Sequence, residues 1–164
     1  MATENLYAPN CIRTNSGIYF NLLAPTIDMV CIEDIAHSLS MQCRFGGHLK
    51  RHYSVAEHCV RVAEALPLEY RFSGLMHDAS EAYIVDVPRP AKMLLPGYKA
   101  LENNIMITIA KKFGFTWPMP KEVERADNYL LSFEWDTFML SRHEGMRQEL
   151  AKQAFLHFFE TLKP

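Results

Sequence analysis

The sequence has no marked excess of charge, no long apolar run and no low-complexity segment. Its 164 residues carry 17 Lys and Arg against 19 Asp and Glu, a formal net charge of −2. A domain that binds a nucleic-acid duplex usually shows a basic excess, so this balance argues against a duplex partner. The apolar runs are too short and too often interrupted by charge to form a transmembrane helix, so no membrane partner is expected.

Paired cysteines are also missing. The four cysteines, Cys11, Cys31, Cys43 and Cys59, form no CxxC motif and no framework spacing. This pattern disfavours both a structural zinc site and a disulfide scaffold. The residues Met1–Glu4 show no secretion signal, so we expect reduced thiols in a cytoplasmic protein.

The length fits a single domain over residues 1–164, and the apolar periodicity predicts an all-α fold with a small N-terminal β-hairpin. The hairpin is expected where Cys11–Arg13 and Ile18–Leu22 flank a turn-forming Thr14–Gly17, within an extension over residues 1–25. Helical spacing follows in six segments, at about 32–39, Ser54–Leu66, Glu69–Ile84, Tyr98–Phe113, Lys121–Leu140 and Gly145–Leu162.

Several local signals position these elements. Thr26 or Asp28 is expected to cap the first helix. Ser54-Val55-Ala56-Glu57 has the pattern of a capping box, with Glu57 reaching back to the helix start. The prolines of Val85–Lys92 predict a stiff, extended connector.

The adjacent pair His77-Asp78 is the centre of the chemistry that the sequence indicates. It offers an imidazole nitrogen and a carboxylate oxygen, which suit a divalent transition metal. Glu81 follows on the same helix, where it is placed to take a proton from water near the metal. Two adjacent polar residues often mark only a solvated helix face, but apolar neighbours such as Leu75 and Ala79 indicate that this pair faces inward.

Two further residues complete a candidate ligand set. His58 lies at the edge of an apolar helical stripe, and Asp127 interrupts another. Alone, each is as well explained by a satisfied core residue or an arginine partner. The loop Gln42–Tyr53 precedes the His58 helix and combines cations, an aromatic and two glycines, which is typical either of an exposed basic loop or of a substrate-pocket wall.

Taken together, the motifs resemble those of HD-domain metal-dependent phosphohydrolases. The order His58, His77-Asp78, Asp127 is similar to the H…HD…D pattern of that family. The similarity is greatest to the 5′-deoxynucleotidase branch, which includes phage dATP triphosphohydrolases. It is carried by Ser54–His58, by His77–Glu81, by Asp86–Lys92 and by the pair Arg44-Phe45.

The resemblance implies an HD-domain helical bundle and a role for each matching residue. The implied ligands of one divalent metal (Zn, Co, Mn or Fe) are His58, His77, Asp78 and Asp127. Glu81 would act on the attacking water, and Asp86 would lie near the leaving group. The implied substrate contacts are Arg44 and Lys92 to phosphate and Phe45 to the base, with Lys50 and Arg89 as further cations. A cytoplasmic homo-oligomer, dimer or hexamer, is implied, in the host cytoplasm if the protein is encoded by a phage.

Three functions remain open at this point. The first is a dATP or dNTP triphosphohydrolase that releases the deoxynucleoside and triphosphate, which the number of cations near the site favours. The second is a 5′-deoxynucleotidase that removes phosphate from dNMPs. The third is a nucleotide-binding regulatory protein without turnover, which the presence of Glu81 disfavours because a binder needs no base there.

Overall fold

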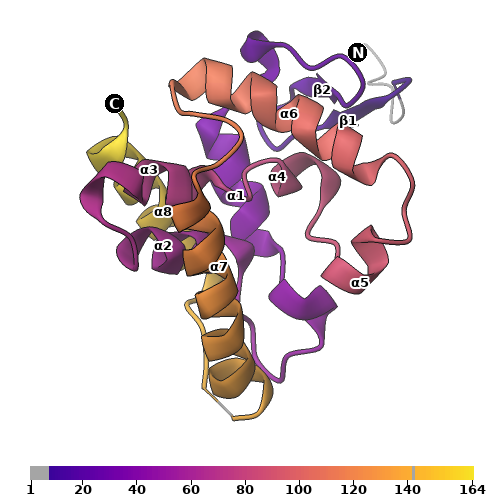
Figure 1. Cartoon of the computed structure of the whole chain (residues 1–164). Coiled ribbons are helices and arrows are strands. Elements are labelled where there is room, and N and C mark those ends of the chain that lie inside the picture. The colour runs from indigo at the N-terminus through magenta and orange to yellow at the C-terminus, as the bar shows by residue number, and fades with distance from the viewer. Residues whose placement is uncertain (1–7, 142) are drawn as a thin grey trace.

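The computed structural model describes residues 8–141 and 143–164, and this part of the chain is mostly helical with one small antiparallel sheet (Figure 1). The elements are β1 (Cys11–Arg13), β2 (Tyr19–Asn21), α1 (Ile32–Met41), α2 (Val55–Glu64), α3 (Leu68–Met76), α4 (Glu81–Ile84), α5 (Arg89–Lys92), α6 (Tyr98–Phe113), α7 (Lys121–Glu134) and α8 (Gln148–Leu162). Short 3₁₀ turns cover Ile27–Met29 and Arg44–Gly47, and a π-turn over Trp135–Met139 follows α7.

Two hydrophobic clusters hold the helices together. The larger one joins the hairpin to α1, α2, α3, α6 and α8, with Phe20, Leu39 and Phe155 fully buried. The smaller one packs Val62 and Leu66 against Val123 and Leu130. It fixes α7, the helix that carries Asp127, alongside α2 and α3, as Figure 1 shows.

The N-terminal hairpin forms as expected from its turn sequence, with Ile12 paired to Phe20. It is fastened to α1 because the Ser16 N–H and hydroxyl both donate to the buried Asp34 carboxylate, at 2.7 and 2.6 Å. The expected extension over residues 1–25 is thus described from residue 8 onward, and its residues 1–7 lie outside the described residues.

The prediction that Thr26 or Asp28 caps the first helix is wrong. Thr26 precedes the 3₁₀ turn Ile27–Met29, and Asp28 lies within it. The residue before α1 is Cys31, which makes no side-chain capping bond. The helix Tyr98–Phe113 ends as predicted, with Gly114 in the left-handed conformation at φ +75° that favours glycine.

The segment Glu69–Ile84 was expected as one helix but is two. Helix α3 ends at Met76, and residues 77–80 form a turn before α4. The Gly74 carbonyl, which a continuing helix would offer to the Asp78 N–H, instead accepts from the His77 ring at 2.7 Å. Backbone bonds of the tighter i to i−3 type follow, such as Glu81 N–H to Asp78 at 2.9 Å. His77 and Asp78 are therefore presented from a helix end, not from a helix face.

The connector Val85–Lys92 is also only partly extended. Its backbone is extended at Pro88, but the following Arg89–Lys92 form the single helical turn α5. A proline in the first turn is compatible with a helix because its missing N–H would have no intrahelical partner there. Because Arg89 and Lys92 are three residues apart in this turn, their side chains lie on the same face of α5.

The capping box at the start of α2 is only half formed. The Ser54 hydroxyl accepts from the Glu57 N–H at 3.1 Å, as predicted. The Glu57 side chain does not return to Ser54 but is buried, where it accepts from Arg61 and from the Met146 N–H. Gly145 allows this approach, because a Cβ at that position would lie 2.7 Å from the Glu57 carboxylate.

No helix in the described ranges combines the length and the apolar character that a bilayer crossing requires.

Glu57 should therefore contribute to stability through the segment that leads into α8. Replacing Glu57 by Ala leaves the half-buried Met146 N–H without its acceptor and Arg61 without its partner, so the free energy of unfolding should fall by about 1–3 kcal/mol. Urea denaturation followed by circular dichroism measures the change. Glu64→Ala, an exposed position on the same helix, is the control and should change little; equal effects of both substitutions would contradict this role.

Candidate metal centre

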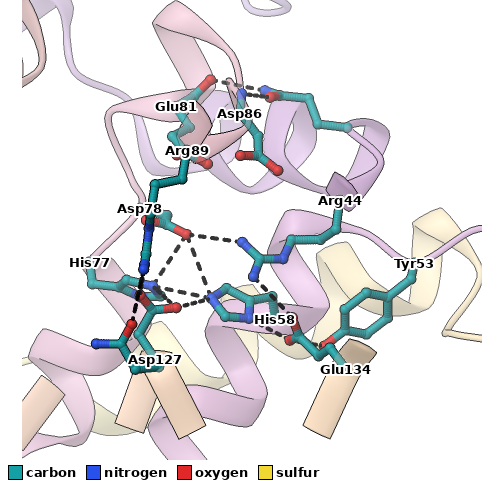
Figure 2. A network of polar contacts seen from close by, with 12 residues as sticks. Arg44, Tyr53, His58, His77, Asp78, Glu81, Asp86, Arg89, Asp127 and Glu134 are labelled. Atoms are coloured by element: carbon teal, nitrogen blue, oxygen red, sulfur yellow. Dashed lines mark hydrogen bonds and ion pairs between the residues drawn. The ribbon is translucent and has the colours of Figure 1, made fainter. Parts of the chain in front are cut away.

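The four predicted metal ligands converge on one point from three parts of the chain. His58 projects from α2, His77 and Asp78 from the end of α3, and Asp127 from α7, and Figure 2 shows these side chains turned toward one another. The Nε2 atom of His58 lies 3.3 Å from that of His77 and 3.1 Å from Asp127 Oδ1. Asp78 Oδ2 lies 3.2 Å from His77 Nε2 and 3.7 Å from His58 Nε2.

These separations fit the donor atoms of one coordination shell. Metal–ligand bonds of about 2.0–2.2 Å place neighbouring ligand atoms about 3.0–3.5 Å apart in tetrahedral or octahedral geometry. The five distances that join the two histidines to each other and to the two aspartates, 3.1–3.8 Å, lie at and slightly above that range. Donor atoms of His58, His77 and Asp127 all lie within 4.8 Å of one another. Two imidazoles and two carboxylates make a donor set that suits a divalent transition metal.

Both imidazoles are held in the tautomer that a metal requires. The Nδ1 atom of His77 lies 2.7 Å from the Gly74 carbonyl oxygen, and Nδ1 of His58 lies 2.5 Å from a carboxylate oxygen of Glu134. Both partners only accept hydrogen bonds, so each Nδ1 must carry the hydrogen. With a metal bound, each Nε2 could direct its lone pair at the shared point. Without one, although burial opposes the charged ring, Asp78 and Asp127 raise the pKa of His77 well above its usual value.

Cys59 offers a second donor set with His77 and Asp78, whose ligand atoms lie within 4.8 Å of one another. The side chain is fully buried, and burial raises the pKa of its thiol to about 11. A thiol must lose its proton to bind a metal well, so this shift disfavours Cys59 as a ligand. The set of two histidines and two aspartates is the better candidate.

Glu134 is the important residue that sequence reasoning did not single out. It is fully buried, and its carboxylate accepts from Tyr53 at 2.6 Å and Arg44 at 2.9 Å, in addition to His58. Although burial opposes ionisation, the bond from the His58 ring keeps the pKa of Glu134 below its usual value. Glu134 lies two helical turns after Asp127 on the same face, but that spacing does not reveal which partners it would meet.

Arg44 faces the centre and is already paired. Its side chain is largely buried between Glu134 and Asp78, whose carboxylate oxygen lies 3.8 Å away. Its Nε–H has no partner among the described residues. Arg44 therefore retains an unused buried donor beside the ligand set.

Glu81 presents one bound and one unbound carboxylate oxygen. Oε1 accepts from Lys92 at 2.8 Å, whereas Oε2 is buried without a hydrogen-bond partner in the described part of the chain. Burial, reinforced by the charges of Asp78 and Asp86, raises the pKa of Glu81 well above its usual value, against the opposing charge of Lys92. The pKa of Asp86 is also raised, chiefly by burial.

The pKa values of the two candidate ligand carboxyls, Asp78 and Asp127, shift in the opposite direction from that of Glu81. Although burial opposes ionisation, the two imidazole rings beside Asp78 and Asp127 keep the pKa of both carboxyls well below the usual range. These two groups thus stay ionised while Glu81 is the more basic carboxyl. Such a separation of pKa values is typical of sites where carboxyls divide binding and proton transfer between them.

A pocket of about 560 Å³ opens over this arrangement. Its lining includes, of the residues expected from the sequence, Arg44, Phe45, Asp78, Glu81, Asp86, Arg89, Lys92 and Asp127. Lys50, expected as a further cation, is exposed and is not part of the lining. The sequence did not point to four lining residues from the end of α7 and the π-turn, which are Leu131, Ser132, Trp135 and Asp136.

Gln42 links this pocket to α1. Its side-chain amide donates to the Glu81 carbonyl at 3.0 Å and accepts from the Asp86 N–H at 2.9 Å. Both acidic residues are therefore positioned through their backbone by one side chain.

Glu134 should govern metal affinity through His58. In Glu134→Ala the His58 ring loses its acceptor and Arg44 its main partner, so the affinity for a divalent ion should fall by about 10–100-fold. Competition with a chelating dye measures the affinity, and Glu134→Gln, which keeps an acceptor for His58, should lose less. Glu124→Ala is the exposed control on α7; an unchanged affinity in folded Glu134→Ala would contradict the assignment.

Comparison with known proteins places the chain among bacterial relatives. No family model matches it. It is 46% identical over 123 residues to the uncharacterized protein YfdR of Escherichia coli, an alignment that covers 75% of this chain and 69% of YfdR. It is 33% identical over 124 residues to an uncharacterized protein of Rhodobacter capsulatus, RCAP_rcc00048, covering 70% of this chain and 63% of that protein. From the first of these matches, the chain belongs to the same protein family as YfdR.

Proposed function

We propose that this protein is a metal-dependent phosphohydrolase of deoxynucleotides with an HD-type centre. The observation that carries the proposal is the convergence of two Nε2 atoms and two aspartate oxygens beside a pocket that also holds a buried, half-bound glutamate. The resemblance of the motifs to HD-domain phosphohydrolases supports the same assignment. A bound divalent ion would polarise the phosphoryl group and make a bound water more acidic.

Side chains of the protein would transfer the protons and stabilise the negative charge in the reaction. The unbound Oε2 of Glu81 is available to take a proton from the attacking water, and Lys92 holds the other oxygen in place. Asp86, with its raised pKa, is suited to protonate the leaving oxygen. The free Nε–H of Arg44 would stabilise negative charge on the phosphoryl oxygens.

The charges around the pocket bear on which phosphate is cleaved. Among the lining residues, the three cations Arg44, Arg89 and Lys92 face five carboxylates. Lys92 lies between Glu81 and Glu102, at 2.8 and 3.1 Å. A divalent ion would make this balance neutral, which leaves little excess positive charge to hold a triphosphate.

The number of cations therefore no longer favours a triphosphate. Lys50 lies away from the pocket, and Arg51 pairs with Glu144 at 3.0 Å. We propose hydrolysis of a deoxynucleoside monophosphate to the deoxynucleoside and phosphate as the better-supported reaction. The dATP or dNTP triphosphohydrolase, which the resemblance also allows, is the second candidate.

Glu81 should be required for turnover but not for metal binding. Glu81→Gln keeps the shape of the side chain and removes its basicity, so kcat should fall by about 10²–10⁴-fold while one ion per chain remains bound. Metal content by elemental analysis and initial rates of phosphate release measure the two properties. Glu69→Gln, an exposed position on α3, is the control, and unchanged turnover in Glu81→Gln would refute the role.

The two candidate reactions differ in their products. With the protein loaded in turn with Zn, Co, Mn or Fe, we expect orthophosphate from dNMPs at a higher kcat/KM than any reaction of dNTPs. Mass spectrometry identifies the products, and His77→Ala should lose both metal and activity.

Intact triphosphate from dNTPs, with dNMPs unreacted, would favour the second candidate. Absence of turnover with every metal would leave a nucleotide-binding protein and contradict hydrolysis.

A further inference from the structure

The pocket has chemically different ends. Asp127 lies at one end with Arg89, 4.0 Å away, and the lining residues Leu131, Ser132, Trp135 and Asp136 follow along the same helical segment. They follow Asp127 by four, five, eight and nine residues, and all four line the same pocket as Asp127. At about 1.5 Å per residue, Asp136 lies roughly 13 Å farther along the axis than Asp127, a span that suits a mononucleotide laid along the helix.

The distal end has an aromatic wall. Phe45 and Trp135 come from separate parts of the chain, and both line the pocket. The centres of their rings are 6.2 Å apart, and the ring planes are tilted by 54°. Trp135 is 48% exposed, and such an open indole in a pocket is suited to contact a planar ring. A nucleobase placed here would leave its phosphate directed toward the metal ligands.

Besides the Arg44 guanidinium, which lies 5.8 Å from the centre of the Phe45 ring and is paired with Glu134, the polar groups at this end are acceptors. The Asp136 carboxylate is exposed and has no hydrogen bond or ion pair with any residue in 8–141 or 143–164. The Ser132 hydroxyl lies one turn before it and donates to the Asn128 carbonyl at 3.4 Å, which leaves the hydroxyl oxygen to accept. An ionised carboxylate only accepts, so both groups complement N–H donors on a ligand.

We propose that Asp136, assisted by Ser132, selects the nucleobase by its N–H donors, with guanine preferred, adenine and cytosine next, and thymine least. Guanine presents a ring N–H and an amino group side by side, which match two carboxylate oxygens. Adenine and cytosine present one amino group. Thymine has a single N–H between two carbonyl oxygens, which repel the carboxylate. This inference rests on the proposed deoxynucleotide function and specifies its substrate.

The test compares dGMP with dTMP in the metal-loaded protein. The ratio of their kcat/KM values should be about tenfold in favour of dGMP and fall to near unity in Asp136→Asn, with the change mainly in KM. The amide of the variant can donate to a thymine carbonyl. Asp28→Asn removes an exposed carboxylate that is not part of the pocket lining and should leave the ratio unchanged.

A binding measurement separates base selection from hydrolysis. Calorimetry with Glu81→Gln, alone and combined with Asp136→Asn, gives the affinities for dGMP and dTMP without turnover. An inactive protein that still shows an Asp136-dependent affinity ratio would retain base selection and contradict hydrolysis. If Asp136→Asn turns over both nucleotides with the same dGMP-to-dTMP ratio as the unsubstituted protein, base selection by Asp136 is wrong but hydrolysis stands. If neither dGMP nor dTMP binds, both the base selection and the deoxynucleotide function are wrong.

Discussion

The buried carboxylate of Glu134 is the contact on which the rest of the site depends. One of its oxygens accepts from the His58 ring and from Tyr53, and the other accepts from Arg44. A single side chain on α7 thus contacts both the candidate metal ligand His58 on α2 and Arg44, the cation that faces the pocket. Since α7 also carries Asp127, any shift of this helix would move both the ligand set and its support.

Burial of so much charge is tolerable only because the groups compensate one another. An unpaired buried carboxylate costs several kcal/mol, but Glu134 has three donors and Glu81 has Lys92. The ligand oxygens of Asp78 and Asp127 lie beside imidazole rings. The unbound oxygen of Glu81 is the exception, and Glu81 is part of the pocket lining.

Much of the fold could be predicted because its signals are local. A turn-forming stretch gives the hairpin, and Gly114 ends α6 where the apolar period stops. The turn at His77 could not be predicted from periodicity, since the apolar spacing continues through it. At this turn the His77 ring contacts the Gly74 carbonyl, and such a contact depends on where the ring is held. The side-chain direction of Glu57 likewise depends on a segment nearly ninety residues away.

In the candidate site, too, some residues could be predicted from the sequence and others depend on contacts made only in the fold. Residue types at His58, His77-Asp78 and Asp127 indicate a candidate ligand set because imidazoles and carboxylates suit a divalent transition metal. The surroundings of each cation depend on its neighbours in space: Lys50 lies outside the pocket lining, and Arg51 pairs with Glu144. Glu134, Trp135 and Asp136 lack any distinguishing sequence context, and only the packing of α7 brings them to the site.

X-ray absorption spectroscopy of the metal-loaded protein tests the central claim most directly. Four nitrogen and oxygen donors from the protein at about 2.0–2.2 Å, with one ion per chain and no sulfur neighbour, are the expected result. A sulfur scatterer at about 2.3 Å would instead assign Cys59 as a ligand, and the absence of any ordered ion would contradict a metal centre at this point.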